Sequence, residues 1–266
     1  MTSASRIALG GWLVAGLLFL HLPLILLVAY SFNAGRLVTV WAGFSTHWYA
    51  SVFSDPTIIR ATLLSLGVAA VSASLATVLG TSLALTFARA GNFSGRTLMS
   101  GLAGIPLVLP EIILGLAFLL LFVALENSLG WPQGRGRLTL VLAHATVGLA
   151  YVTVVVRARL AGMPTELEEA ARDLGATPWR TFRSVTLPLI LPGVAAGWLL
   201  AFTLSLDDVV IASFVSGPGA STLPMLIYSK VRLGLSPEIN ALATLLILAV
   251  AGAVSLSMVF LHRSRP

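Results

Sequence analysis

Long apolar runs alternate with short polar connections along most of the chain. A helix needs about 20 mostly apolar residues to cross the hydrocarbon core of a bilayer. Six runs reach that length: Leu9–Val28, Ala61–Phe87, Leu98–Leu125, Leu138–Val156, Leu187–Leu206 and Ile239–Leu261. The connections leave little sequence for a soluble domain. The pattern therefore predicts a single membrane domain over residues 1–266, all-α, with about six transmembrane helices.

The composition agrees with a membrane protein. Of the 266 residues, 57% are hydrophobic and 10% are charged, whereas soluble domains carry about a quarter charged residues. The absence of cysteine excludes disulfides and thiolate metal sites. The first apolar run follows Arg6 and could be mistaken for a signal peptide. It is too long for one and lacks a small-x-small cleavage site, so we favour a retained helix.

The net charge of +6 carries a topology signal. If the N-terminus is cytoplasmic, six spans return the C-terminus to the cytoplasm. The inside segments then hold ten basic residues: Arg6, Arg89, Arg96, Arg157, Arg159, Arg172, Arg180, Arg183, Arg263 and Arg265. The outside segments hold six: Arg36, Arg60, Arg135, Arg137, Lys230 and Arg232. This moderate positive-inside bias predicts that both termini are cytoplasmic.

Small residues and prolines within the runs predict how the helices pack and bend. Small residues recur every fourth position in the second run: Ser72, Ala76, Gly80 and Ala84. This spacing lets helix backbones approach closely, and packing within the chain is favoured over a dimer face. Prolines interrupt the third and fifth runs: Pro106, Pro110, Pro188 and Pro192. At Pro110-Glu111 a predicted break adjoins a carboxylate inside a run.

The most polar stretch, Glu166–Gly193, lies between two apolar runs and holds four of the ten acidic residues. Thr165 and Glu168 have the spacing of a capping box that would start a helix. Gly175 is placed to end it, and Thr177-Pro178 is placed to start a second one. The sequence therefore predicts a hairpin of two short helices, with Trp179, Phe182 and Val185 on the apolar side of the second.

Three roles for this hairpin differ in their chemistry. A DNA-binding helix pair is disfavoured because four acids would face phosphate groups. An element lying on the membrane is disfavoured because glutamates repel anionic lipid. A rigid knob for a cytoplasmic partner, with Trp179 as its aromatic anchor, fits best.

The spacing of this stretch resembles the coupling loop of ABC-importer permeases, E-A-A-x3-G-x9-I-x-L-P. The matching residues are Glu169-Ala170-Ala171, Gly175 and Val185-Thr186-Leu187-Pro188, with valine in place of isoleucine. Three further stretches resemble polyamine permeases, and most of all the second membrane subunit of bacterial putrescine importers: Leu37–Tyr49, Pro106–Leu125 and Ser205–Leu245. The resemblance spans nearly the whole chain, with a family core at about 57–262 and a coupling loop at 165–188.

The resemblance implies a type I ABC importer permease fold in the bacterial inner membrane. It implies as partners a second homologous permease chain, two ATPase subunits and a periplasmic polyamine-binding protein. ATP and magnesium would be bound by the ATPase, with no cofactor in this chain. Glu169, Ala170, Ala171 and Gly175 would carry the docking and turn roles, alongside the Trp179 anchor. ATP-driven closure of the ATPase pair would move the loop and switch the spans between inward-open and outward-open states.

No catalytic or metal motif is present. The only lysine, Lys230, lacks the glycine frame of a P-loop, and no histidine pair has zinc spacing. His21 and His144 are isolated within apolar runs. We interpret both as packed or hydrogen-bonded rather than as ligands.

Carboxylates at membrane depth are candidates for a solute path. Counted along straight helices at about 1.5 Å per residue, Glu111 lies roughly 20 Å above the cytoplasmic face and Asp207 about 29 Å. With Asp208 they could neutralise the two charges of a diamine, and Trp48 in the first outer loop could add a cation–π contact. Alternatively, Glu111 is protonated or paired with an arginine, and the two aspartates cap a short helix.

The sequence thus predicts a permease subunit for polyamines, most of all putrescine. Three alternatives stay open: a permease for another small cationic solute, a membrane enzyme using Glu111 with Asp207 or Asp208, and a scaffold that recruits an ATPase. The coupling spacing favours transport, because an enzyme has no need of it.

Overall fold

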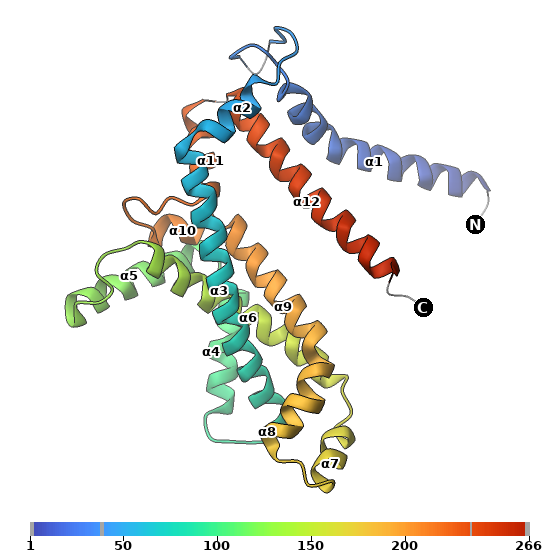
Figure 1. Cartoon of the computed structure of the whole chain (residues 1–266), viewed down its shortest axis with the longest axis vertical. Helices are drawn as coiled ribbons and strands as arrows, with labels where there is room; N and C mark the ends of the chain where they lie inside the picture. Colours follow the sequence, from blue (N-terminus) through green and yellow to red (C-terminus); the bar gives the residue numbers. More distant parts are fainter. Residues whose placement is uncertain (1–2, 38–39, 235, 264–266) are drawn as a thin grey trace. The chain divides into compact units, whose positions relative to one another are not determined.

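A computed structural model describes residues 3–37, 40–234 and 236–263 (Figure 1). Within these residues it holds twelve α-helices, one π-helical turn and no strand beyond a single bridge between Asn33 and Phe44. The helices are α1 (Ser3–Tyr30), α2 (His47–Ser54), α3 (Pro56–Arg89), α4 (Arg96–Val108), α5 (Glu111–Leu129), α6 (Arg137–Ala161), α7 (Glu166–Asp173), α8 (Pro178–Thr181), η1 (Phe182–Thr186), α9 (Leu187–Asp207), α10 (Val210–Val215), α11 (Leu223–Leu233) and α12 (Pro237–Arg263).

The chain forms two compact units, with residues 1–59 and 227–266 in unit 1 and residues 60–226 in unit 2. The single domain over residues 1–266 and the family core at about 57–262 stay predictions. A few predicted features lie outside the described residues: positions 38–39 and 235 of the family-like stretches, and Arg265 of the charge count.

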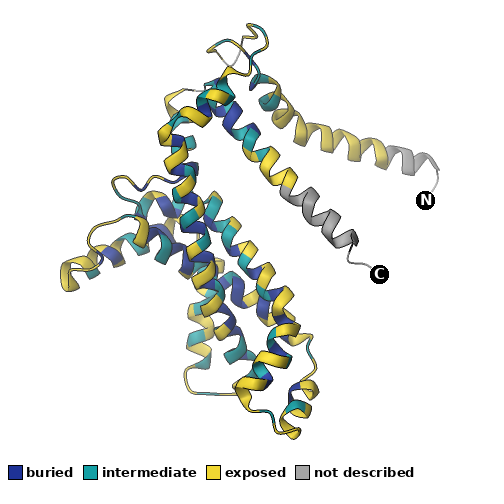
Figure 2. Cartoon of the chain, viewed as in Figure 1, coloured by how far each residue is buried: buried dark blue, intermediate teal, exposed yellow. Residues whose placement is uncertain are grey.

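In unit 1, α1 and α2 both pack on α12. Every residue of α1 from position 9 to position 26 is exposed, although most of them are apolar (Figure 2). Trp12 and Phe19 are about four-fifths exposed. An apolar helix of 28 residues with so little cover is suited to lipid or to a neighbouring membrane subunit.

The loop after α1 is organised by the buried side chain of Asn33. Its amide nitrogen donates to the carbonyls of Leu37 and Val40, and its amide oxygen accepts from the backbone of Gly35 and Ala42. All the hydrogen-bonding groups of this side chain are therefore engaged by the loop itself, which fixes the entry into α2.

In unit 2, α6 packs most extensively on α9, and α3 joins them in one core cluster. The four small residues predicted to form a packing stripe on α3 are all buried. A Cβ on Gly80 would lie 2.9 Å from the Leu149 carbonyl and the Val152 side chain, and one on Gly148 would lie 3.0 Å from Ala76. The stripe thus serves packing within the chain, as predicted, because only small residues let α3 and α6 approach this closely.

Five helical segments are long and apolar enough to cross a membrane within the described residues: Leu9–Tyr30, Pro56–Arg89, Glu111–Leu129, Arg137–Ala161 and Pro178–Asp207. The sixth predicted run lies in α12, whose described apolar part is Pro237–Gly252. The structure thus describes five candidate spans and part of the sixth predicted run.

The third predicted run is not one helix. It divides into α4 and α5 at Leu109-Pro110, and both residues have extended ψ angles, 139° and 138°. The predicted break is therefore confirmed, but the bounds Leu98–Leu125 are wrong, because the helix long enough to span is Glu111–Leu129. The physical reason is Pro110, which cannot donate a backbone hydrogen bond and disfavours helical geometry in Leu109 before it.

The fifth run begins earlier than predicted. α8, η1 and α9 follow one another without a gap from Pro178 to Asp207, so the second hairpin helix is not a separate short element. Pro188 has no N–H for the Ser184 carbonyl, and the preceding Leu187 N–H reaches back five residues to Phe182. A π-turn absorbs the missing bond while the helix continues.

Lys230 on α11 is the centre of an ionic cluster in unit 1. Its Nζ lies 2.9 Å from Glu238 Oε2 and 3.3 Å from Asp55 Oδ2, and Ser51 donates to Glu238. Burial alone would lower the pKa of Lys230, but the hydrogen bond and charge of Glu238, followed by those of Asp55, raise it overall. For Asp55, burial acts to raise the pKa, and hydrogen bonds from Thr57 and Lys230 lower it overall.

Replacing Lys230 with methionine should lower the free energy of unfolding by about 1–2 kcal/mol at pH 7, or several degrees in Tm. The lowered pKa of Asp55 stabilises the fold at pH values above the pKa of an unfolded aspartate, about 3.9. The raised pKa of Lys230 stabilises the fold at pH values below the pKa of an unfolded lysine, about 10.4. The Tm difference should therefore be constant between about pH 5 and 9 and shrink towards pH 3. Thermal unfolding of both proteins in detergent measures it, and an unchanged Tm at pH 7 would contradict this account.

Candidate functional sites: a polar cavity and a charged hairpin

A cavity of about 290 Å³ lies in unit 2 where two helices are interrupted. Pro106 in α4 and Glu111 at the start of α5 lie on either side of one break, and Asp207, Asp208 and Val209 come from the break between α9 and α10. α6 contributes the wall between them. α5 and α10 pack on each other, which brings the two breaks together.

Two carboxylates in the cavity wall are free of protein partners. Glu111 and Asp207 are both exposed, and within the described residues neither forms a side-chain hydrogen bond or ion pair with another residue. Glu111 begins α5, where the N-terminal end of the helix favours a negative charge. The cavity therefore presents two acidic groups to whatever enters it.

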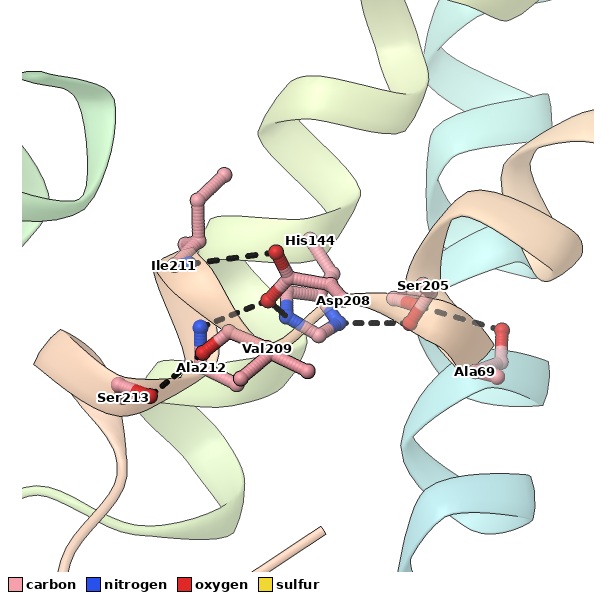
Figure 3. A network of polar contacts seen from close by, with 9 residues as sticks. Ala69, His144, Ser205, Asp208, Val209, Ile211, Ala212 and Ser213 are labelled. Carbon is pink, nitrogen blue, oxygen red and sulfur yellow. Dashed lines mark hydrogen bonds and ion pairs between the residues drawn. The ribbon is translucent and has the colours of Figure 1, made fainter. Parts of the chain in front are cut away.

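Asp208, next in sequence to Asp207, is committed to the protein. Its Oδ2 accepts from the Ala212 N–H at 2.7 Å and its Oδ1 from the Ile211 N–H at 3.2 Å (Figure 3). These are donors of the first turn of α10, so Asp208 caps that short helix. The predicted alternative, a capping role, is thus confirmed for Asp208.

His144 of α6 links this cap to the neighbouring helices. Its Nε2 lies 3.1 Å from Asp208 Oδ2 and its Nδ1 lies 2.6 Å from Ser205 Oγ (Figure 3). Ser205 Oγ accepts in turn from the Ser72 hydroxyl on α3 at 3.1 Å. An ionised carboxylate can only accept, so Nε2 carries a proton. In the neutral ring, Nδ1 then accepts from Ser205. Because the His144 and Asp208 side chains are 3% and 8% exposed, this chain of contacts fixes the break from inside.

The structure places Glu111 and Asp207 in the wall of one cavity, at two helix breaks. Their depths, counted along straight helices, stay predictions. The interpretation of His144 as hydrogen-bonded is confirmed. Sequence reasoning missed its link to Ser205 and Asp208, as well as Tyr151 in the wall. Since His144 lies on α6 while Ser205 and Asp208 lie at and just after the end of α9, no sequence spacing predicts this link.

Trp48 is engaged locally in unit 1. Its indole N–H donates to the Asn33 carbonyl at 2.8 Å, and its ring contacts His47 with centroids 4.6 Å apart. Its part in a solute path stays a prediction.

The charged hairpin consists of α7 and the beginning of the long helix that follows. α7 begins at Glu166, as predicted, but the capping box is wrong: the Thr165 side chain caps nothing and Glu168 points elsewhere. The end of α7 is confirmed. Gly175 has a φ of 83°, its N–H donates to the Arg172 carbonyl, and the Ala176 N–H donates to Ala171. This pair of bonds is the Schellman arrangement, which needs a residue with positive φ and so favours glycine.

The start of the second helix is also confirmed. The Thr177 side chain accepts from the Arg180 N–H, with Pro178 in the first turn. The hairpin is thus held at its corner by backbone geometry and stays compact without a large core.

The outward surface of the hairpin is both apolar and acidic. Leu174 is 90% exposed and Trp179 is 69% exposed. Glu169 and Ala170 are exposed, and Ala171 is partly exposed. Within the described part of the chain, Glu169 has no protein partner. Such side chains have nothing to pack against in this chain, which is typical of a docking surface.

Glu168 behaves in the opposite way to its neighbour. Its side chain is 6% exposed and its Oε2 lies 3.0 Å from Arg89 Nε, at the end of α3. Its Oε1 accepts from the Thr186 hydroxyl at 2.8 Å. Successive helix residues point about 100° apart, which explains why one glutamate faces the protein and the next faces outward.

The described residues contain no group of three or more His, Cys, Asp or Glu side chains able to hold a metal ion. The acids of the cavity are also poorly arranged for acid–base catalysis. Asp208 already accepts three hydrogen bonds. The remaining acids, Glu111 and Asp207, are both exposed and unpaired, so their surroundings do not make one an acid and the other a base.

Comparison with known proteins gives a consistent family. A model of the binding-protein-dependent transport system inner membrane component matches residues 76–265. The chain is 55% identical over 238 residues to the putrescine transport system permease protein PotI of Escherichia coli, covering 90% of this chain and 85% of that one. It is 40% identical over 242 residues to the spermidine/putrescine transport system permease protein PotC of Escherichia coli, covering 91% and 89%.

A solved structure shares the fold. The crystal structure of a bacterial ABC transporter involved in import of the acidic polysaccharide alginate superposes with a TM-score of 0.75 at 19% identity, over 99% of this chain and 96% of that one. Fold and relatives define the class: an all-α permease of the type I ABC importer fold, a non-catalytic multi-pass subunit of the inner membrane. The chain belongs to the family of binding-protein-dependent transport system inner membrane components.

The two aspartates at the break should differ in their effect on stability. Replacing Asp208 with asparagine removes the charge that the α10 N–H groups and His144 contact, and should lower the free energy of unfolding by about 2 kcal/mol. The matched change Asp207→Asn should stay within about 0.5 kcal/mol of the unmodified protein. Thermal unfolding in detergent measures both. Equal destabilisation by the two variants would show that the cap is not what holds the break.

Proposed function

We propose that this chain is the membrane-spanning permease subunit of an ATP-driven importer that carries polyamines, putrescine above all, from periplasm to cytoplasm by alternating access. The observation that carries the substrate class is the pair of free carboxylates, Glu111 and Asp207, in one cavity at two helix breaks. The names of the relatives PotI and PotC, which are putrescine and spermidine/putrescine permeases, point the same way.

The charge of a diamine matches this cavity. Alkyl ammonium groups titrate near 10, so putrescine carries two positive charges at neutral pH. Such a solute sheds part of its hydration shell to cross the membrane and needs anionic groups to replace it. Two separate carboxylates can each neutralise one ammonium group, and the Tyr151 ring in the wall offers a face for a cation–π contact.

The helix breaks support a moving path. Interrupted helices occur within membranes where the freed backbone groups are buried in protein or line an aqueous cavity. Here, Asp208 and His144 satisfy one break from the protein side and leave Asp207 on the open side. Rotation of α5 and α9 about their breaks would change access to the cavity without unfolding either helix.

The charged hairpin supplies the link to ATP. In this proposal, Glu169, Ala170 and Trp179 dock on one of two ATPase subunits, which bind ATP and magnesium, while Ala171 and Gly175 maintain the shape of the loop. A second, similar permease chain completes the membrane body, and a periplasmic binding protein delivers the polyamine. The hairpin then lies in the cytoplasm, as do both termini, in agreement with the positive-inside bias.

The main alternative is transport of another small cationic solute. It differs only in the solute that the binding protein delivers, so the wall of the cavity does not decide it. Reconstitution of the whole complex in liposomes, with uptake of putrescine, spermidine and amino acids compared at equal concentration, decides between them. Putrescine uptake should be fastest, and uptake of amino acids alone would contradict the polyamine assignment.

Replacing Asp207 with asparagine or Glu111 with glutamine should slow putrescine uptake about tenfold, because losing one charge contact costs about 1.4 kcal/mol along the path. Glu126→Gln is the matched control: it makes the same change on α5 at a residue outside the cavity wall. Uptake by liposomes is normalised to the amount of ATPase that copurifies. Normal uptake by both cavity variants would remove them from the path.

Replacing Glu169 with alanine should weaken retention of the ATPase subunits about tenfold, because an exposed docking charge is lost. The neighbouring exposed acid gives the control variant Glu166→Ala, which should retain them. Copurification of the ATPase at increasing salt measures the difference. Equal retention by the two variants would assign docking to other residues of the hairpin.

A further inference from the structure

Glu168 is the only buried residue of α7. A helix of eight residues usually attaches to its protein through an apolar face, but here Leu167, Ala170 and Leu174 are exposed. The contact that fixes α7 to the rest of unit 2 is instead a carboxylate with two partners. Burying a charge is costly unless the charge is paired and hydrogen-bonded, as that of Glu168 is.

The two partners of Glu168 belong to different membrane helices. Arg89 is the last residue of α3, and its Nε lies 3.0 Å from Glu168 Oε2. Thr186 ends the π-turn that leads into α9, and its hydroxyl lies 2.8 Å from Glu168 Oε1. A single carboxylate therefore connects α7 to the ends of both α3 and α9. The i,i+4 neighbour Arg172, at 4.0 Å and more than half exposed, adds little.

The covalent connections of α7 cannot do the same work. Before it, the chain passes through Gly162-Met163-Pro164, and after it through the turn at Gly175. These connections lead to α6 and to α8, so the backbone does not link α7 directly to α3. Among the hydrogen bonds and ion pairs that α7 makes with other elements in the described residues, the one that reaches α3 is the pair of Arg89 and Glu168.

We infer that Glu168 is a positioning residue for energy coupling: it transmits displacement of the docked α7 to α3 through Arg89 and to α9 through Thr186. This role rests on the proposed function, in which α7 docks on an ATPase, and it is distinct from docking, which exposed residues perform. Glu168 cannot contact a partner directly, because its side chain is 6% exposed.

The ion pair has room to change as α7 moves. Only Nε of Arg89 contacts the carboxylate, while its Nη2 is buried and has no hydrogen-bond partner among the described residues. A guanidinium can bind a carboxylate through two parallel N–H groups. The single contact seen here can thus become a paired one in the other state of the permease, giving α7 different contacts in the two states, as coupling requires.

The test uses the complete complex, with partner permease, ATPases and binding protein, reconstituted in liposomes. Glu168→Gln removes the charge that pairs with Arg89 and keeps the size of the side chain. It should leave ATPase copurification unchanged and lower the number of putrescine molecules taken up per ATP hydrolysed at least threefold. Glu166→Gln, the same change at an exposed acid of the same helix, should keep the ratio of the unmodified complex.

A double variant identifies the path of transmission. If Glu168 acts through Arg89, the double variant Arg89→Gln with Glu168→Gln should lose no more coupling than Glu168→Gln alone. Additive losses would overturn this link. Thr186→Val removes the second contact without changing charge and should lower the ratio by a smaller factor, which keeps the test decisive if Glu168→Gln does not assemble.

The outcomes separate this inference from the proposed function. An unmodified complex that retains no ATPase or takes up no polyamine would contradict the proposed function. If the unmodified complex takes up polyamine and the Glu168→Gln or Thr186→Val complex assembles and stays fully coupled, the role of Glu168 is contradicted while the proposed function stands. Loss of ATPase binding in Glu168→Gln would make Glu168 a docking residue and also overturn the inference.

Discussion

The structure depends on how it satisfies polar groups where helices break within the membrane-spanning part of unit 2. A break leaves backbone N–H groups without partners, and in lipid each costs several kcal/mol. Asp208 accepts from the N–H groups of Ile211 and Ala212, and His144 holds the carboxylate in place. With that break secured, α9 can end and α10 begin beside the break between α4 and α5. The cavity exists because both interruptions are stable there.

Adjacent acids divide their roles at both functional sites. Asp208 caps a helix and Glu168 connects three elements, while their neighbours Asp207 and Glu169 stay exposed and unpaired. Carboxylates are few in this chain, with ten aspartates and glutamates in 266 residues. Two of them therefore provide rigid support beside the groups that, in the proposed function, meet substrate or partner. The arrangement suits a transporter, since a mobile carboxylate or a loose hairpin would not transmit binding energy.

The sequence predicted the elements whose signals are local. The apolar runs, the glycine that ends α7 and the threonine cap of α8 all follow from nearby residues. The prediction from sequence failed for side chains whose contacts are with residues far away in the chain. Glu168 has the spacing of a capping residue but pairs with Arg89, 79 positions away, and the contact between His144 and Asp208 spans 64 positions. The break at Pro110 was predicted, but the bounds of the third span were not, because the spanning helix begins only after that proline, at Glu111.

The central claim, that the cavity at the paired breaks is a water-accessible passage for a diamine, can be tested by single-cysteine labelling because the chain has no cysteine of its own. Val147 lines the cavity, and Val154 lies on the same helix, exposed but outside it. In the reconstituted complex, Val147→Cys should react with a charged, membrane-impermeant thiol reagent, and putrescine should slow that reaction. Val154→Cys should be unreactive. A Val147→Cys thiol that never reacts, or that reacts at the same rate with and without putrescine and ATP, would contradict the account.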